Sequence, residues 1–306
     1  MANVFIDGSA GTTGLRIAQR LGSREDISII RLPDALRKDI NARVDAIHSA
    51  DVSFLCLPDD AAKEIAAAAG EMGTIIDTST AHRVDPDWVF GFPELPGQRE
   101  KIASSRRIAN PGCHASGFIA LVAPLVHCGL MDPHTALSCF SLTGYSGGGK
   151  KMIAQYEDPN RDPLLNAPRQ YGLTQAHKHL PEMVQICGLA TEPAFCPIVA
   201  DFYSGMEVTV SLFSDQLKGT VADIADCYRS LYTGSLVRYT DNPDPDGLLS
   251  AVALSGRDDM TVSVFGNDDR ILLVSRFDNL GKGASGAAIQ NMNILLGLPE
   301  ETGLIV

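Results

Sequence analysis

The sequence of 306 residues predicts two domains, one of them a doubly wound α/β domain and the other built on a mixed or antiparallel sheet. Three observations predict this fold class. First, a glycine-rich turn joins a strand-like segment to a helix-like one near the N-terminus. Second, strand-like and helix-like segments alternate through the first third. Third, strand-like segments with apolar residues at every second position, and a hairpin, follow later. With 45% hydrophobic residues, the chain can bury a large core.

Charge and cysteine usage exclude several functions. A formal net charge of -12 opposes binding to nucleic acid or acidic membranes, because phosphate contacts need clustered cations. The seven cysteines are odd in number and never form a Cys-x-x-Cys pair, which indicates reduced thiols and neither a disulfide framework nor a zinc site. Apolar runs are shorter than the roughly 20 residues of a membrane span, and the N-terminus lacks a secretion signal. We expect a cytoplasmic protein without a metal.

The first element is a strand over Asn3–Asp7, followed by glycines at positions 8, 11 and 14 and a helix from Leu15. Such glycines let the backbone approach a pyrophosphate, which the exposed N–H groups of the helix start then bind. The spacing is G-x-x-G-x-x-G and not the commoner G-x-G-x-x-G, so a tight turn without a ligand is the alternative. The residues expected to contact a cofactor are Gly8, Ser9, Ala10, Gly11, Thr12, Thr13 and Gly14.

Further strands are expected over 27–31, 51–58 and 74–79, with a helix over 59–69, which together indicate a parallel sheet. Leu57 and Pro58 end the third strand at the carboxyl edge, where ligands of open α/β sheets bind. The second strand ends in Arg31, and Arg37 and Lys38 follow. These cations favour NADP with its 2'-phosphate over NAD, although Arg37 and Lys38 could equally form a solvated basic patch.

Cys113 stands between a Pro-Gly turn and a helix-like run that contains Pro124. At a helix N-terminus the unpaired N–H groups and the helix dipole stabilise a thiolate, the form that attacks carbonyls. The alternative is a small buried residue, which is how we interpret four other cysteines in apolar runs. Those four are Cys56, Cys128, Cys139 and Cys227.

Two later stretches carry further candidate groups. The segment 144–151, GYSGGGKK, could offer backbone N–H groups and lysine charge to an anion, or be a flexible linker. His177 and His179 precede a helix expected to begin near Pro181. They could ligate a metal, but no further cluster completes a zinc set, so a histidine acting as acid and base beside a thiol is the better interpretation.

The second domain is expected to hold a strand over Met206–Phe213 with four apolar side chains on one face, and a hairpin of 261–266 with 270–277. A helix over 221–232 covers the sheet, and 239–247 is a loop. The alternative to a catalytic role is that this domain serves as a scaffold and subunit interface. The four apolar residues are Met206, Val208, Val210 and Leu212.

Taken together, these motifs resemble the short, type 2 family of N-acetyl-gamma-glutamyl-phosphate reductases of arginine biosynthesis. The matching stretches span positions 7 to 293, nearly the whole chain, and PGCHA is the most specific of them. They read DGSAGTTGLRI, FLCLPDDAA, IIDTSTAHR, ANPGCHASGFIALVAPL, GYSGGGK, HKHLPE and DNLGKGASGAAIQNMN.

The resemblance implies an NADP-binding Rossmann domain over 1–112 and 283–306, interrupted by an α+β catalytic and oligomerisation domain over 113–282. This arrangement is shared with aspartate-semialdehyde and glyceraldehyde-phosphate dehydrogenases. It further implies NADPH-dependent reduction of an acyl phosphate to a semialdehyde through a cysteine thioester, in a homodimer or homotetramer.

By the same resemblance, Cys113 is the nucleophile and the pair His177 and His179 holds the catalytic base. Three residues are expected as further cofactor contacts: Ser146, Gly147 and Asn291. Five are expected to bind substrate: Arg83, His82, Asn110, Glu182 and Lys150.

Three alternatives stay open. One is another phosphorylating semialdehyde dehydrogenase, of the aspartate or lysine-pathway type. Another is a non-catalytic NADP-binding regulator, against which the combination of Cys113, the histidine pair and Arg83 argues. The third is a thiol redox protein, although no resolving cysteine lies close to Cys113 in the sequence.

Overall fold

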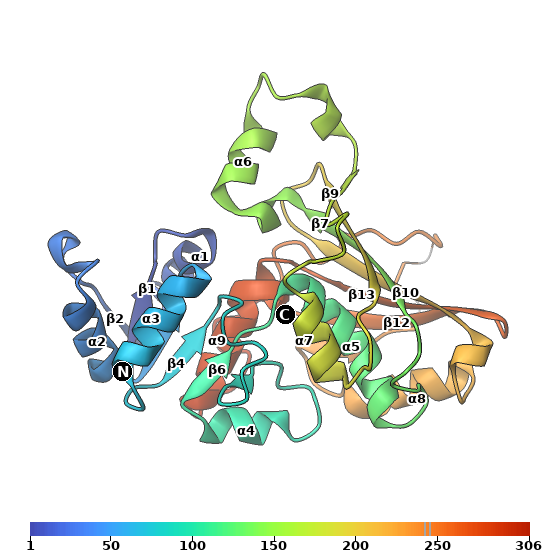
Figure 1. Ribbon diagram of the computed structural model, residues 1–306, viewed down its shortest axis with the longest axis horizontal. Helices are drawn as coiled ribbons and strands as arrows, with labels where there is room; N and C mark the ends of the chain where they lie inside the picture. The colour runs from blue at the N-terminus through green and yellow to red at the C-terminus, as the bar shows by residue number, and fades with distance from the viewer. Residues whose placement is uncertain (242, 245) are drawn as a thin grey trace. The chain divides into compact units, whose positions relative to one another are not determined.

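The structure is a computed structural model that describes residues 1–241, 243–244 and 246–306. The chain divides into two compact units (Figure 1). The first comprises Met1–Pro111 and Ala284–Leu304, and the second comprises Gly112–Gly283 and Ile305–Val306. In the part of the chain that the structure describes, no helix is both long and apolar enough to cross a membrane.

The first unit holds a six-stranded sheet whose strands all pair in parallel, in the order β2-β1-β3-β4-β6-β5. Its strands are β1 (Ala2–Asp7), β2 (Ile27–Ile30), β3 (Val52–Leu55), β4 (Ile75–Asp77), β5 (Val89–Phe90) and β6 (Arg107–Ala109). Its helices are α1 (Thr12–Leu21), α2 (Ile40–Ser49), α3 (Asp59–Ala69), α4 (Gln98–Ser104), α9 (Gly286–Leu295) and the 3-10 turn η1 (Asp34–Leu36).

Alternation along β1 divides the core of this unit between the two faces of the sheet. Val4 and Ile6 pack with residues of α1 and α9, whereas Phe5 packs with residues of α2 and α3. Successive side chains of a strand point to opposite faces, so an apolar run such as Val4–Ile6 requires helices on both. The doubly wound parallel sheet predicted from the sequence is confirmed.

The second unit holds a seven-stranded mixed sheet in the order β11-β12-β13-β10-β7-β9-β8, as predicted. The pairs β7·β9 and β11·β12 are parallel and the others antiparallel. Its strands are β7 (Ser138–Gly144), β8 (Arg169–Gln170), β9 (Ala194–Ala200), β10 (Met206–Phe213), β11 (Val237–Tyr239), β12 (Met260–Gly266) and β13 (Arg270–Phe277). Its helices are α5 (Cys113–His127), α6 (Gly149–Glu157), α7 (Leu180–Cys187) and α8 (Val221–Leu231), with 3-10 turns η2 (Tyr145–Gly148), η3 (Pro163–Asn166) and η4 (Ser214–Gln216).

Helix α5 packs against β10 and β13, and α8 lies beside it against β12 (Figure 1). The four apolar residues of β10 expected on one face are all buried. The predicted hairpin is also confirmed as β12 and β13, which pair antiparallel from Met260 with Phe277 to Gly266 with Ile271. This sheet therefore supports α5, the helix that begins at Cys113.

Several local predictions were wrong. The segment 144–151 is no open loop: it forms the turn η2 and the start of α6, so Lys150 and Lys151 lie in a helix. The good helix formers that follow the glycines outweigh them. Cys128 is exposed and not buried, while Cys139 is buried as expected. A π-helix, Gly281–Ser285, precedes α9 and was not foreseen. The expected loop 239–247 includes Asn242 and Pro245, which lie outside the described residues.

Candidate active site

Three glycines stand in the turn between β1 and α1. At two of them a side chain would collide with the main chain, and at the third it would not. Gly8 has a φ of 82°, and a Cβ there would collide with the carbonyl of Cys56. A Cβ at Gly14 would lie 2.6 Å from the carbonyl oxygen of Gly8. At Gly11, the N-cap of α1, the closest atom would be that oxygen at an ordinary 3.5 Å. Packing does not exclude a side chain at Gly11, so the open space over the helix start fits an anionic ligand.

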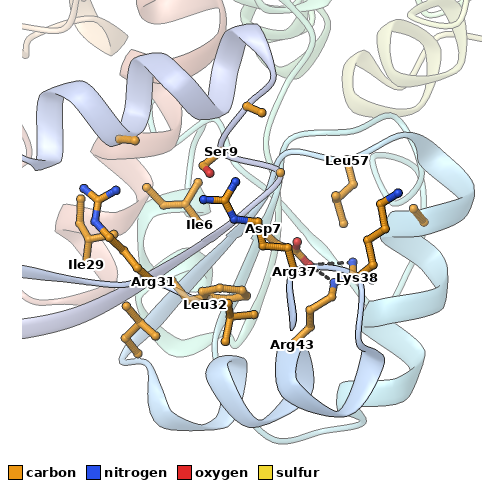
Figure 2. A pocket seen from close by; sticks show the side chains of 16 residues that line it. Ile6, Asp7, Ser9, Ile29, Arg31, Leu32, Arg37, Lys38, Arg43 and Leu57 are labelled. Atoms are coloured by element: carbon orange, nitrogen blue, oxygen red, sulfur yellow. Dashed lines mark hydrogen bonds and ion pairs between the residues drawn. The ribbon is translucent and has the colours of Figure 1, made fainter. Parts of the chain in front are cut away.

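Beside this turn lies a cavity of about 370 Å³, lined by residues of β1, β2, the glycine turn and the start of α3 (Figure 2). Figure 2 shows the side chains of Arg31, Arg37 and Lys38 around it. Arg37 also pairs with Asp34 at 2.8 Å, and both of those side chains are exposed. The predicted contacts Gly8, Ser9, Ala10, Arg31 and Leu57 all line the cavity.

A buried ion pair forms part of the wall of this cavity. Asp7, at the end of β1, meets Arg43 of α2 at 2.7 Å. Burial raises the pKa of Asp7, against the opposing effect of Arg43. Since both partners are nearly covered, the pair fixes α2 against the end of β1.

Cys113 is the first residue of α5, with Gly112 as the N-cap in an extended conformation. The Gly112 N–H donates to Oε2 of Glu182 at 3.1 Å, and Glu182, in the first turn of α7, is almost wholly buried. A Cβ at Gly283 would lie 2.9 Å from Cβ of Cys113, so glycine at 283 leaves room beside the cysteine. The Glu182 carboxylate thus holds the main chain at Gly112, the residue before Cys113.

His114, which the sequence interpretation did not assign, lies at the centre of a cluster in this unit. Its Nδ1 bonds Oγ of Ser141 and its Nε2 bonds the hydroxyl of Tyr171, each at 2.6 Å. Burial, and then the neighbouring charge of His177, lower the pKa of His114 to about 3. This imidazole is therefore neutral at physiological pH and positions its two hydroxyl partners.

Tyr171 connects the cluster to the cysteine. Burial, and then the negative charge of a Cys113 thiolate, raise the pKa of the Tyr171 hydroxyl. The Tyr171 hydroxyl therefore stays protonated. A neutral phenol can donate a hydrogen bond, and its partner in this structure is Nε2 of His114.

The two predicted histidines lie against His114 and differ in exposure. Their ring centroids are 4.7 Å apart and each is 5.6 Å from that of His114. His179 is buried at the N-cap of α7, whereas His177 is half-buried. The main-chain N–H of His179 donates to Nδ1 of His177 at 3.2 Å. A neutral His177 therefore carries its proton on Nε2 and can donate from it.

Among the remaining predicted residues of the first unit, Arg83 and Asn291 both bond Asn110. His82 bonds Asp77 at 2.7 Å and stacks on Trp88 with centroids 4.0 Å apart. Arg83 donates through Nε to the carbonyl oxygen of Asn110 at 3.0 Å. Asn291 donates to Oδ1 of Asn110 at 3.3 Å and to the carbonyl oxygen of Gly91 at 2.9 Å. Thr12 and Thr13 lie in the first turn of α1, and Pro58 is the N-cap of α3.

In the second unit, the predicted residues of the glycine-rich segment divide by exposure. Ser146 is buried and accepts a hydrogen bond from Nδ2 of Asn279 at 3.0 Å, whereas Gly147 and Lys150 are exposed. Among the described residues, no group of three or more His, Cys, Asp or Glu could hold a metal ion.

The pKa of His114 is about 3 in the folded chain, against the ordinary value of 6.5 that applies to the unfolded chain. Between these two pH values the unfolded chain therefore binds more protons than the folded chain. We therefore expect stability to be full above pH 6.5 and to fall as the pH drops toward 3, by up to about 1.4 kcal/mol per pH unit. Urea midpoints measured across this range should fall less steeply in His114→Gln. The exposed His134→Gln is the control and should keep the wild-type slope; equal slopes in all three proteins would contradict the assignment.

Comparison with known proteins agrees with this fold. Residues 113–279 match the family described as semialdehyde dehydrogenase, dimerisation domain, and residues 35–105 match semialdehyde dehydrogenase, NAD binding domain. Aspartate semialdehyde dehydrogenase II from Vibrio cholerae superposes with a TM-score of 0.73 at 16% identity, covering 97% of this chain and 98% of that one. The enzyme from Francisella tularensis gives 0.71 at 17% identity, with 97% and 100% covered. At these identities the likeness shows the fold.

Two curated relatives are much more similar in sequence. An N-acetyl-gamma-glutamyl-phosphate reductase from Brucella ovis is 46% identical over 305 residues, covering 96% of this chain and 98% of the relative. N-acetyl-gamma-glutamyl-phosphate reductase 2 from Nostoc sp. is 44% identical over 317 residues, covering 98% of each.

A parallel dinucleotide-binding domain combined with a cysteine at the start of a helix on a mixed sheet defines a semialdehyde dehydrogenase that uses a nicotinamide cofactor. The chain belongs to the N-acetyl-gamma-glutamyl-phosphate reductase family. The resemblance seen in the sequence is thereby confirmed.

Proposed function

We propose that this protein reduces N-acetyl-gamma-glutamyl phosphate to N-acetylglutamate 5-semialdehyde and phosphate in arginine biosynthesis, using NADPH. The observation that carries the proposal is Cys113 at the N-terminus of α5, beside a buried carboxylate and a histidine cluster. Dinucleotide binding belongs in this proposal to residues 1–112 and 283–306, and acyl transfer to 113–282.

In the first step the Cys113 thiolate attacks the acyl carbon of the substrate. The C–S bond forms, the bond from carbon to the phosphate oxygen breaks, and phosphate leaves with its electron pair. The helix start stabilises the thiolate and offers N–H groups to the negative oxygen that develops. Glu182 has a positioning role here beside the predicted substrate contact, because its Oε2 accepts the N–H of Gly112.

In the second step the thioester is reduced; when bound, the reduced nicotinamide supplies the hydride. The chain's own residues act on the thioester oxygen. His177 is assigned the hydrogen bond to this oxygen, because its Nδ1 is engaged and its Nε2 carries the proton. The oxyanion then collapses, the C–S bond breaks, and the electron pair returns to the sulfur. The base expected in the histidine pair is assigned to His179, since His177 is committed to donating.

The test runs the reaction in reverse. Protein supplied with NADP and N-acetylglutamate semialdehyde should form NADPH, followed by its absorbance, only when inorganic phosphate is added. Turnover of aspartate semialdehyde instead would favour the alternative dehydrogenase. No turnover with any semialdehyde, in protein that is folded and binds NADP, would overturn the enzyme proposal in favour of a regulator.

NADP is proposed over NAD because Arg31, Arg37 and Lys38 surround the cavity beside the glycine turn. A charge-assisted hydrogen bond contributes about 1.5–3 kcal/mol, so Arg31→Ala should raise the KM for NADPH about 10- to 100-fold and leave the KM for NADH unchanged. Steady-state kinetics with both cofactors measures this ratio. Arg37→Ala is the matched control with a smaller effect, since Arg37 already pairs with Asp34. An unchanged ratio in Arg31→Ala would contradict the assignment.

A homodimer or homotetramer is proposed from the matched dimerisation domain and the open face of the mixed sheet. On β10, Val208 and Val210 face α5, so Thr209 and Ser211 face the other way. Phe140 pairs with Thr209 and Leu272 with Ser211, and both apolar side chains are more than 40% exposed. An exposed apolar face of this kind is typical of an interface. Light scattering should give a mass two or four times that of the 32.7 kDa chain, and a monomeric mass would contradict the proposed oligomer.

A further inference from the structure

Two cysteines outside the active site lie almost in contact. Sγ of Cys128, just after α5, is 3.2 Å from Sγ of Cys227 in α8, although the residues are 99 positions apart. Both are thiols in this structure, and Cys128 is exposed while Cys227 is partly covered. We propose that Cys128 and Cys227 are a peroxide-sensitive pair that forms a reversible disulfide within one chain.

The neighbouring helices already hold the two thiols in place. From α8, the hydroxyl of Tyr228 donates to the carbonyl oxygen of Leu121 in α5 at 2.6 Å. One turn further on, the hydroxyl of Tyr232 donates to the carbonyl oxygen of Ala120 at 2.6 Å. Disulfide formation shortens the separation of the sulfurs from 3.2 Å to about 2.05 Å, a small change between two helices that these contacts hold together.

The fold excludes two other candidate disulfides, Cys113 with Cys128 and Cys139 with Cys196. Cys113 stands at the opposite end of α5, and 15 residues of helix separate the ends by about 22 Å. In the parallel pair of β7 and β9, Cys139 is opposite Phe195 and Cys196 is opposite Phe140. Cys139 and Cys196 therefore point to opposite faces of the sheet and cannot bridge each other. Among the described cysteines, the geometry singles out Cys128 with Cys227.

The chemistry balances with one peroxide molecule. The exposed Cys128 sulfur attacks a peroxide oxygen, the O–O bond breaks, and a sulfenic acid and water result. The Cys227 sulfur then attacks the Cys128 sulfur, the S–O bond breaks, and a second water leaves. Two thiols are oxidised and one hydrogen peroxide is reduced to two waters. Burial, and then the contact with Cys128, raise the pKa of Cys227 to about 12, so Cys128 is the thiol that reacts first.

The experiment treats the full chain with limiting hydrogen peroxide in a Cys113→Ser background, so that the active-site thiol consumes no oxidant. The expected product is about 2 Da lighter, regains its mass with dithiothreitol, and yields a linked peptide whose fragments join Cys128 to Cys227. Cys128→Ser should abolish the linked peptide. Cys196→Ser, which removes another partly covered thiol, should retain it.

Three outcomes would overturn the inference. They are a sulfinic acid at Cys128 with Cys227 still a thiol, a link between two chains, and a link that survives in Cys128→Ser. Circular dichroism of each variant before oxidation establishes that it is folded. Because the readout is the covalent product, its result does not depend on the proposed enzymatic activity.

Discussion

Cys113→Ser is expected to lower acyl-phosphate reduction at least ~10³-fold, as removal of a catalytic nucleophile does, while the protein folds and binds NADPH as before. A serine hydroxyl is harder to ionise than a thiol, so the helix start of α5 would hold little alkoxide. If an ester did form, its carbonyl would be a poorer hydride acceptor than that of a thioester. Serine is close to cysteine in size and fits the space beside Gly283.

The measurement is phosphate-dependent NADPH formation from the semialdehyde. NADPH fluorescence titration and thermal melting, performed on the same preparations, show that the dinucleotide site and the fold are retained. Cys196→Ser is the matched control, because it exchanges the same atoms at a partly covered thiol outside the histidine cluster. Wild-type rates in Cys113→Ser would exclude the thioester route and leave the fold assignment standing.

The first unit was predictable because its signals are local. Apolar runs such as Val4–Ile6 bury on both faces, and glycines such as Gly8 occupy a turn that a side chain would block. The helix over 59–69 has the predicted bounds, since Pro58 precedes it and Gly70 ends it. Cys113 at a helix start likewise follows from a Pro-Gly turn before an apolar run. Each of these depends on residues within a few positions of one another.

The contacts that the sequence does not reveal join distant positions. Tyr171 meets His114 across 57 positions, Glu182 meets Gly112 across 70, and Cys227 meets Cys128 across 99. No local pattern marks such pairs, because they depend on long-range packing such as that of α7 and α8 against α5. His114 follows Cys113 directly, which is the one sequence signal that could have drawn attention to it. For 144–151, the prediction of a loop was wrong because it gave the glycines more weight than the helix-forming residues that follow them.

His177→Leu is expected to lower kcat about 10²- to 10³-fold, the loss typical of removing one hydrogen-bond donor to an oxyanion. Leucine fills much of the space against the ring of Phe195, whose centroid lies 5.1 Å from that of His177, but it cannot donate. The acyl-phosphate KM should change less than kcat, because the negative oxygen exists only after attack on the carbonyl. Steady-state kinetics in the reductive direction separates the two parameters, and the exposed His134→Leu controls for loss of a histidine elsewhere.

His177→Gln distinguishes a donor from a base. A glutamine amide can donate an N–H at a similar reach but cannot take up a proton near neutral pH. If His177 acts by donating from Nε2, as the hydrogen bond to its Nδ1 indicates, His177→Gln should recover part of the activity lost in His177→Leu. Its kcat should also keep the wild-type dependence on pH. Equal inactivity of the two variants, with the acid limb of the pH profile lost in both, would instead make His177 the base. The main-chain N–H of His179 selects the tautomer of His177 that carries its proton on Nε2. That tautomer decides whether His177 acts as a hydrogen-bond donor to the oxyanion or as the base.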